Sequence, residues 1–151
     1  MKILMVCLGN ICRSPLAEGI LRKKIEGQRL NVEVASAGFV SYHEGDSADR
    51  RAQKTAAQFG IDLSHHKASV FKYSDFNDYD QIYVMDNENM KDVLHLAKNS
   101  DDRKKIDLIL NEIFPGKNQT VPDPYYGGTE GFLKVYHLLD KACNAIIQKI
   151  K

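Results

Sequence analysis

The chain has 151 residues, 43% hydrophobic and 27% charged, a size and composition ordinary for one soluble globular domain, so we expect a single domain over residues 1–151. A formal net charge of +1 creates no overall field, which argues against nucleic acid or an anionic membrane as a partner. Three cysteines, an odd number without zinc-site spacing, argue against a secreted disulfide framework and against a metal site.

The first stretch predicts a strand, a tight loop and a helix. Residues 2–6 form an apolar run typical of a buried parallel strand. Ser14 and Pro15 open a helical pattern, with Ser14 as N-cap and Pro15 at the first helical position. The loop between them starts with the thiol of Cys7 and ends with the guanidinium of Arg13. Because no signal-peptide pattern precedes the strand and no apolar run approaches about 18 residues, we expect a cytoplasmic protein.

This loop has the chemistry of an anion site with a nucleophile. At a helix N-terminus, backbone N–H groups point at one spot and the helix dipole adds positive charge. Gly9 allows the backbone to approach a ligand closely, and Arg13 can hold two phosphate oxygens at once. The same field favours thiolate over thiol at Cys7. A lone cysteine here would indicate only buried packing, but the combination favours catalysis.

A second strand follows the first helix. The apolar stripe of the helix comprises Leu16, Ile20, Leu21 and Ile25, and Gly27 ends it. Residues 31–38 alternate as a strand and break at glycine. This order implies a right-handed parallel crossover, with ligands binding beyond the carboxyl ends of the strands, where Cys7 and Ser36 both fall.

The middle of the chain continues the pattern. Residues 39–46 predict a loop, and a small-residue helix then stops at Gly60, with Ala48, Ala52, Ala56 and Phe59 facing inward. The neighbouring His65 and His66 suggest a metal, but adjacent side chains of an extended segment point to opposite sides, so we expect none.

Residues 79–85 predict a third strand, and Asp86 caps the helix that follows, a role we prefer to catalysis. The polar run 99–105 predicts a solvated loop, and residues 106–110 a short fourth strand. The last helix has apolar residues at 3–4 spacing, namely Phe132, Val135, Leu139, Ala142, Ile146 and Ile150. Cys143 lies on or beside this stripe and is expected to be inert packing.

Between the fourth strand and the last helix, Pro122 and Pro124 flank Asp123 and restrict the backbone on both sides. An aspartate that forms a turn is the default explanation. A rigid mount is also what a general acid needs, because its position must bring it within hydrogen-bond reach of the leaving group.

These motifs resemble the low-molecular-weight protein tyrosine phosphatases nearly end to end. Residues 7–14 are similar to the family's phosphate-binding loop, and Asp123-Pro-Tyr-Tyr126 is similar to its acid loop. The resemblance implies a flavodoxin-like α/β fold: a three-layer sandwich with a four-stranded parallel sheet in the order 2-1-3-4 and helices on both faces. It also implies hydrolysis of phosphotyrosine in protein substrates through a cysteinyl-phosphate, without metal or other cofactor, and with inorganic phosphate as product or inhibitor.

The resemblance assigns roles residue by residue. Cys7 would be the nucleophile, Arg13 the ligand of the phosphoryl group, and Asp123 the acid. The substrate-binding set would be Leu8, Gly9, Asn10, Ile11, Cys12, Ser14, Tyr42, Tyr125 and Tyr126. The loop-supporting set would be Asn10, Ser36 and His66, while Ser69 replaces the family's usual arginine. On local grounds alone, Ser36 is equally a turn hydroxyl and Tyr42 equally an exposed loop tyrosine.

Cys12 is either packing in the loop or the partner of Cys7 in a reversible disulfide formed under peroxide. Three alternative activities are disfavoured. An arsenate reductase of similar fold uses further downstream cysteines, and this chain has only Cys143 there. An arginine-phosphate hydrolase tends to carry a smaller polar residue at the position of Ile11. A binding module without turnover would not need both Cys7 and Asp123.

Overall fold

Four parallel strands in the order β2-β1-β3-β4 form the central sheet of the computed structural model, which describes residues 1–151. The strands are β1 (Lys2–Val6), β2 (Glu33–Ala37), β3 (Gln81–Val84) and β4 (Ile106–Leu108). β1 is one of the two inner strands, and its Val6 pairs with Ala37 of β2 and Val84 of β3, so three strands end at one level beside Cys7. The predicted strand order is confirmed.

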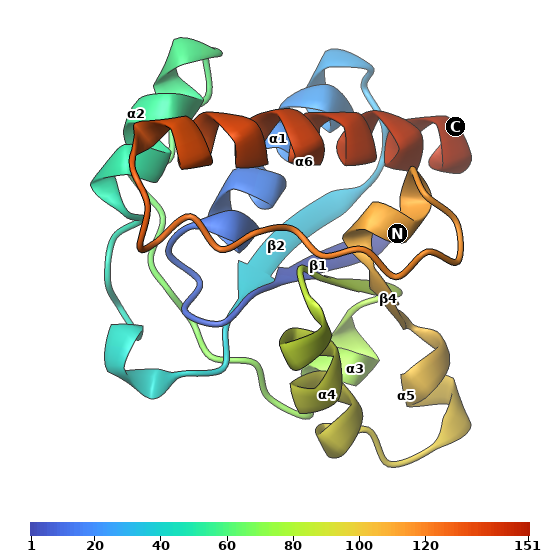
Figure 1. The fold of residues 1–151 in the computed structure, drawn as a ribbon. Helices are drawn as coiled ribbons and strands as arrows, with labels where there is room; N and C mark the ends of the chain where they lie inside the picture. The colour runs from blue at the N-terminus through green and yellow to red at the C-terminus, as the bar shows by residue number, and fades with distance from the viewer.

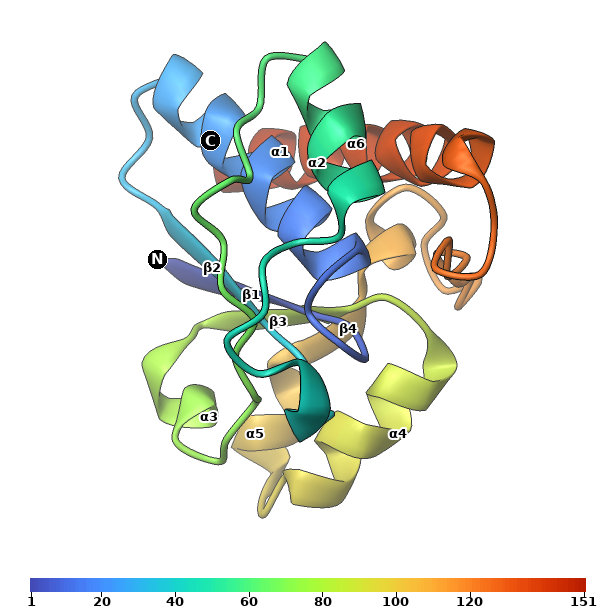
Figure 2. The ribbon, with the colours of Figure 1, turned by 90° about the vertical axis from the view of Figure 1, so that its left-hand side faces the viewer.

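Helices cover both faces of this sheet (Figure 1). One layer holds α1 (Arg13–Gly27), α2 (Arg50–Gln58) and α6 (Thr129–Ile150), and the other holds α3 (Asp75–Asp78), α4 (Asn87–Leu96) and α5 (Ser100–Lys104). The view turned by 90° shows the sheet between the two layers (Figure 2). This confirms the predicted three-layer arrangement.

Alternation along β1 divides the core in two. Ile3 and Met5 pack with α1, α2 and α6, whereas Leu4 and Val6 pack with the cluster around Phe76. All four side chains are buried, as expected for a strand covered on both faces. Packing on both faces therefore fixes β1, and with it the start of the loop at Cys7.

The prediction that Ser14 caps α1 is wrong. The helix begins one residue earlier, at Arg13, and the N-cap residue is Cys12, which makes no side-chain capping bond. The Ser14 hydroxyl lies 2.9 Å from the sulfur of Cys7, and its backbone N–H donates to that sulfur at 3.4 Å. A tertiary partner has therefore replaced the expected local cap. Pro15 remains in the first turn, where no intrahelical N–H bond is lost.

Residues 99–105 are also not the predicted loop. They contain α5, whose first turn is capped by the Asn99 side chain accepting from the N–H of Asp102 at 2.8 Å. Acidic residues at its start and basic residues at its end suit the helix dipole.

The other expected elements are present with small shifts in their bounds. Asp86 caps α4 by accepting from the N–H of Asn89 at 2.8 Å, as predicted. The apolar stripe of α6 is confirmed, with Cys143 fully buried beside it. Two short 3-10 turns, η1 (Ser41–His43) and η2 (Ile109–Glu112), complete the chain. None of the helices combines the length and the apolar character that crossing a bilayer would take.

Candidate active site

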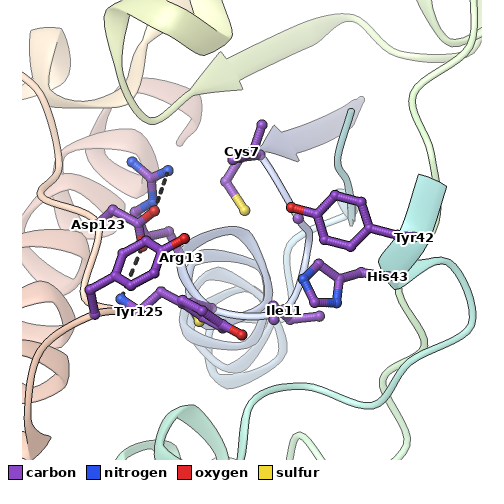
Figure 3. A pocket seen from close by; sticks show the side chains of 11 residues that line it. Cys7, Ile11, Arg13, Tyr42, His43, Asp123 and Tyr125 are labelled. Atoms are coloured by element: carbon purple, nitrogen blue, oxygen red, sulfur yellow. Dashed lines mark hydrogen bonds and ion pairs between the residues drawn. The ribbon is translucent and has the colours of Figure 1, made fainter. Parts of the chain in front are cut away.

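A pocket lies where the chain leaves the carboxyl end of β1 (Figure 3). Its lining residues are Cys7, Leu8, Gly9, Ile11, Cys12, Arg13, Tyr42, His43, Asp123, Tyr125 and Tyr126. Ten of these eleven were singled out from the sequence, and His43 was not. Two predicted substrate-binding residues, Asn10 and Ser14, do not line the pocket, because their side chains are fully buried beneath the loop.

The sulfur of Cys7 faces the N-terminus of α1. Cys7 is 3% exposed, and its backbone N–H donates to the carbonyl of Ala37 in β2 at 3.2 Å. The loop also packs tightly against the turn after β2, since a Cβ atom added to Gly38 would lie 2.8 Å from the carbonyl oxygen of Leu8. The loop backbone is therefore held rigidly around the sulfur.

Arg13 is buried, with 3% of its side chain exposed, and its guanidinium has fixed partners. Nη1 donates to the carboxylate of Asp86 at 2.7 Å and to the carbonyl of Val121 at 3.0 Å, while Nη2 lies 3.8 Å from Asp123. Asp86 thus caps α4 and also orients Arg13, a second role that sequence reasoning missed. Its position two residues after the end of β3, at the same sheet edge as Cys7, was the available signal.

Asn10 is the centre of the hydrogen bonds beneath the loop. Its backbone is left-handed, with φ of 57°, a conformation that asparagine tolerates. Its Nδ2 donates to the hydroxyls of Ser14 at 2.8 Å and Ser36 at 2.9 Å. Its Oδ1 accepts from the N–H of Ser69 at 2.9 Å, and its carbonyl accepts from Nε2 of His66 at 2.7 Å.

The predicted supporting residues therefore meet behind the loop. His65, in contrast, is exposed, so the two histidines do not share a site. No group of three or more His, Cys, Asp and Glu side chains is arranged to hold a metal ion. Ser69, which stands where the family usually has arginine, bonds to the loop through its N–H and donates its hydroxyl to the carbonyl of Ser36 at 3.2 Å.

Aromatic side chains form the mouth of the pocket. Tyr42 and His43 come from η1, with their rings 4.5 Å apart, and face Tyr125 across the opening in Figure 3. The ring centre of His43 is 6.4 Å from that of Tyr125, and the Nδ1 atom of His43 is 3.0 Å from the carboxylate of Asp46. Tyr126 is 91% exposed, further out than the others. Nothing local in the sequence places His43 at the pocket, because its partner across the opening, Tyr125, comes from a distant segment.

Asp123 approaches from the segment before α6. One carboxylate oxygen accepts from the N–H of Tyr125 at 3.0 Å, and the other lies 3.8 Å from Arg13. Its side chain is 39% exposed, so it meets both the pocket and water. Asp123 thus closes one side of the pocket that Cys7 and Arg13 line (Figure 3).

The other two cysteines differ from Cys7 in environment. Burial raises the pKa of the Cys12 thiol far above its ordinary value, and the negative charges of Asp49 and Cys7 raise it further. Burial also raises the pKa of Cys143 to about 12, and its sulfur lies 3.8 Å from the carbonyl of Ala17. Both thiols are therefore protonated at neutral pH.

Comparison with known proteins agrees with this geometry. Residues 2–151 match the model of the family described as low molecular weight phosphotyrosine protein phosphatase. A putative low molecular weight protein-tyrosine-phosphatase of Synechocystis is 38% identical over 152 residues, covering 99% of this chain and 96% of the relative. A protein tyrosine phosphatase of Entamoeba histolytica superposes with a TM-score of 0.92 at 39% identity, over 99% of this chain and 96% of the other. Wzb of Vibrio vulnificus, solved with benzylphosphonate, superposes with a TM-score of 0.87 at 34% identity, over 98% of this chain and 97% of the other.

Proposed function

Because the chain belongs to the low molecular weight phosphotyrosine protein phosphatase family, a family of cysteine-based enzymes, we propose that Cys7, Arg13 and Asp123 carry its phosphatase reaction. The observation that supports this assignment best is that Asp123, from the far end of the chain, lies 3.8 Å from Arg13 in the pocket that Cys7 lines. A nucleophile, a phosphate-binding cation and a carboxyl group thus share one small site.

In the first step, the thiolate of Cys7 attacks the phosphorus in line with the leaving oxygen. A sulfur–phosphorus bond forms and the oxygen–phosphorus bond breaks. The loop N–H groups and Arg13 stabilise the equatorial oxygens, because these donors are already oriented before the reaction. The carboxyl group of Asp123 gives its proton to the departing phenolate, which leaves as a neutral phenol.

In the second step, the carboxylate of Asp123 takes a proton from a water molecule that attacks the phosphorus. The sulfur–phosphorus bond breaks, inorganic phosphate forms, and Cys7 leaves as a thiolate beside the Ser14 hydroxyl. Asp123 is then protonated again, so the enzyme returns to its starting state. The product phosphate fits the same cradle and would act as a competitive inhibitor.

The pocket favours an aryl phosphate as substrate. Ile11 supplies an apolar wall, and the rings of Tyr42 and Tyr125 can pack against an aromatic leaving group. The Vibrio vulnificus relative was solved with benzylphosphonate, a ligand that joins an aromatic ring to a phosphorus group. This supports the choice of an aryl phosphate here. We therefore propose phosphotyrosine in proteins as the substrate.

A substrate panel tests this proposal directly. Turnover is measured on phosphotyrosine, phosphoserine and phosphoarginine peptides, with arsenate reduction alongside. We expect hydrolysis of phosphotyrosine above the others, no turnover by Cys7→Ser, and slower turnover by Asp123→Ala, most of all with poor leaving groups. Full activity of Cys7→Ser would refute the nucleophile, and faster turnover of phosphoarginine than of phosphotyrosine would refute the substrate class.

A further inference from the structure

The segment that carries the acid forms few hydrogen bonds with the rest of the protein. Within residues 122–127, the N–H of Tyr125 donates to Asp123 and the N–H of Gly127 to the carbonyl of Pro124, both at 3.0 Å. Only one side chain from the rest of the protein, that of Arg51, forms hydrogen bonds with this segment. Its Nη1 donates to the carbonyl of Gly127 and its Nη2 to the carbonyl of Tyr125, each at 2.8 Å.

Arg51 is itself held in place on α2. Its Nε and Nη2 donate to the two carboxylate oxygens of Asp49 at 3.1 and 3.0 Å. Its guanidinium carbon lies 4.7 Å from the ring centre of Phe132 and 5.7 Å from that of Tyr125. Arg51 therefore contacts four oxygen acceptors and two rings, a geometry that suits a planar guanidinium and that a lysine ammonium cannot reproduce.

Asp49 extends this connection to the phosphate-binding loop. Its side chain caps α2 by accepting from the N–H of Arg51 at 2.8 Å, and its backbone N–H donates to the carbonyl of Ile11 at 2.8 Å. The loop that holds the phosphate and the segment that holds the acid are thus joined through two consecutive groups, Asp49 and Arg51. Arg51 is not among the residues that line the pocket, so it acts on the reaction through the segment.

We propose that Arg51 is a positioning residue, which fixes residues 122–127 to the start of α2 and so keeps the Asp123 carboxyl group over Cys7. The inference rests on the proposed role of Asp123 as the acid. The flanking prolines restrict the segment's own backbone angles, but they have no N–H and so donate no hydrogen bond to the body of the protein. Because a general acid works only within hydrogen-bond reach, a small displacement of the segment costs proton transfer while the cradle around Cys7 stays intact.

The test uses aryl phosphates whose leaving groups differ in basicity. With Arg51→Met, which keeps an apolar stem, we expect kcat/KM for phenyl phosphate to fall about tenfold or more, part of the factor that a general acid supplies. For 2,4-dinitrophenyl phosphate, whose phenolate leaves without a proton, we expect a change below about twofold. Arg51→Lys, which keeps the charge, is expected to show the same selective loss and serves if the methionine variant folds poorly. Arg50→Met is the matched control, because Arg50 is the exposed neighbour on α2 and its side chain makes no hydrogen bond or ion pair with the segment.

A second measurement places Arg51→Met on an Asp123→Ala background. If Arg51 acts through the acid, the Arg51→Met substitution causes no further loss of kcat/KM in the Asp123→Ala enzyme with either substrate. An equal loss on both substrates in the single variants, or the same added factor without Asp123, would overturn the positioning role and leave the acid assignment standing. If the loss of kcat/KM in Asp123→Ala did not depend on the leaving group, the acid assignment would be overturned, and the positioning role with it.

Discussion

The sulfur of Cys7 lies 2.9 Å from the hydroxyl oxygen of Ser14, and that oxygen already accepts a hydrogen bond from the side chain of Asn10 at 2.8 Å. Since the Asn10 amide can only donate through Nδ2, the Ser14 proton is free to point at the sulfur. When Cys7 is a thiolate it can only accept, so Ser14 is then the donor in this pair. Its contribution is greatest when Cys7 is anionic, because hydrogen bonds to charged groups are stronger than neutral ones.

We predict that Ser14→Ala slows the step in which Cys7 leaves as a thiolate. A hydrogen bond to a charged group contributes about 1.5–3 kcal/mol, so kcat should fall roughly tenfold to a hundredfold. Rapid mixing with nitrophenyl phosphate should then give a burst of phenol, since the cysteinyl-phosphate accumulates. Ser41→Ala, at an exposed serine, provides the control. A Ser14→Ala enzyme with wild-type kcat and no burst would show that the hydroxyl does not assist departure.

The contrast between Ser14 and Cys7 explains what the sequence could predict. Cys7 and Arg13 lie in one short loop whose strand and helix are recognisable locally, so their pairing needed no tertiary information. The prediction that Ser14 caps the helix was wrong because its hydroxyl is hydrogen-bonded to the sulfur of Cys7, just after β1. Likewise Asp86 contacts Arg13 across 73 positions of sequence, and no local pattern encodes that distance.

His43 and Arg51 were missed for the same reason. Their distant partners, the ring of Tyr125 for His43 and the carbonyl groups of residues 125 and 127 for Arg51, come from the segment that the sequence indicated only as the mount of the acid. The helix at 100–104 is a different case, because the Asn99 cap and the charge order were visible in the sequence. There the local signal existed and the high polarity of the run outweighed it.

We predict that iodoacetate modifies one cysteine of the native protein at neutral pH, and that this is Cys7. Burial raises the pKa of Cys12 and that of Cys143, so both remain thiols, and thiols react far more slowly than thiolates. Peptide mapping by mass spectrometry identifies the adduct. Inorganic phosphate should protect the protein by occupying the pocket, and Cys7→Ser should remain unlabelled. Early labelling of Cys143 in the folded protein would contradict the prediction.

Peroxide should inactivate the enzyme reversibly through a Cys7–Cys12 disulfide. The Cys7 thiolate is oxidised to a sulfenic acid as peroxide is reduced to water; the Cys12 sulfur then attacks it, a sulfur–sulfur bond forms and water leaves. Because the raised pKa keeps Cys12 protonated, disulfide formation should accelerate with rising pH. The measurements are a mass loss of two hydrogens, by about 2 Da, and the activity regained with a dithiol.

Cys12→Ser supplies the decisive comparison for the disulfide. Without a second thiol, the sulfenic acid of Cys7 has no nearby partner and proceeds to sulfinic acid, which a dithiol does not reverse. We therefore expect Cys12→Ser to recover much less activity than wild type after the same exposure, while Cys143→Ser recovers equally well. Equal recovery by Cys12→Ser would rule out protection by a disulfide.

The carboxylate of Asp49 should make stability depend on acid pH. Burial by itself raises the pKa of Asp49, but hydrogen bonds from the side chain and backbone of Arg51 outweigh this and hold the pKa below its ordinary value of 3.8. A group with a lowered folded-state pKa stabilises the protein above its unfolded pKa, and that contribution disappears as pH falls through the folded value.

Asp49→Asn keeps the N-cap acceptor but removes the charge. Thermal unfolding should therefore show wild type about 3 °C more stable than Asp49→Asn at pH 7, the shift that about 1 kcal/mol produces in a domain of this size. The difference should hold down to about pH 5 and narrow below about pH 4, whereas Asp101→Asn, at an exposed carboxylate, should show no such trend. A difference that stays constant or widens on acidification would mean that the Asp49–Arg51 pair does not stabilise the fold through its charge.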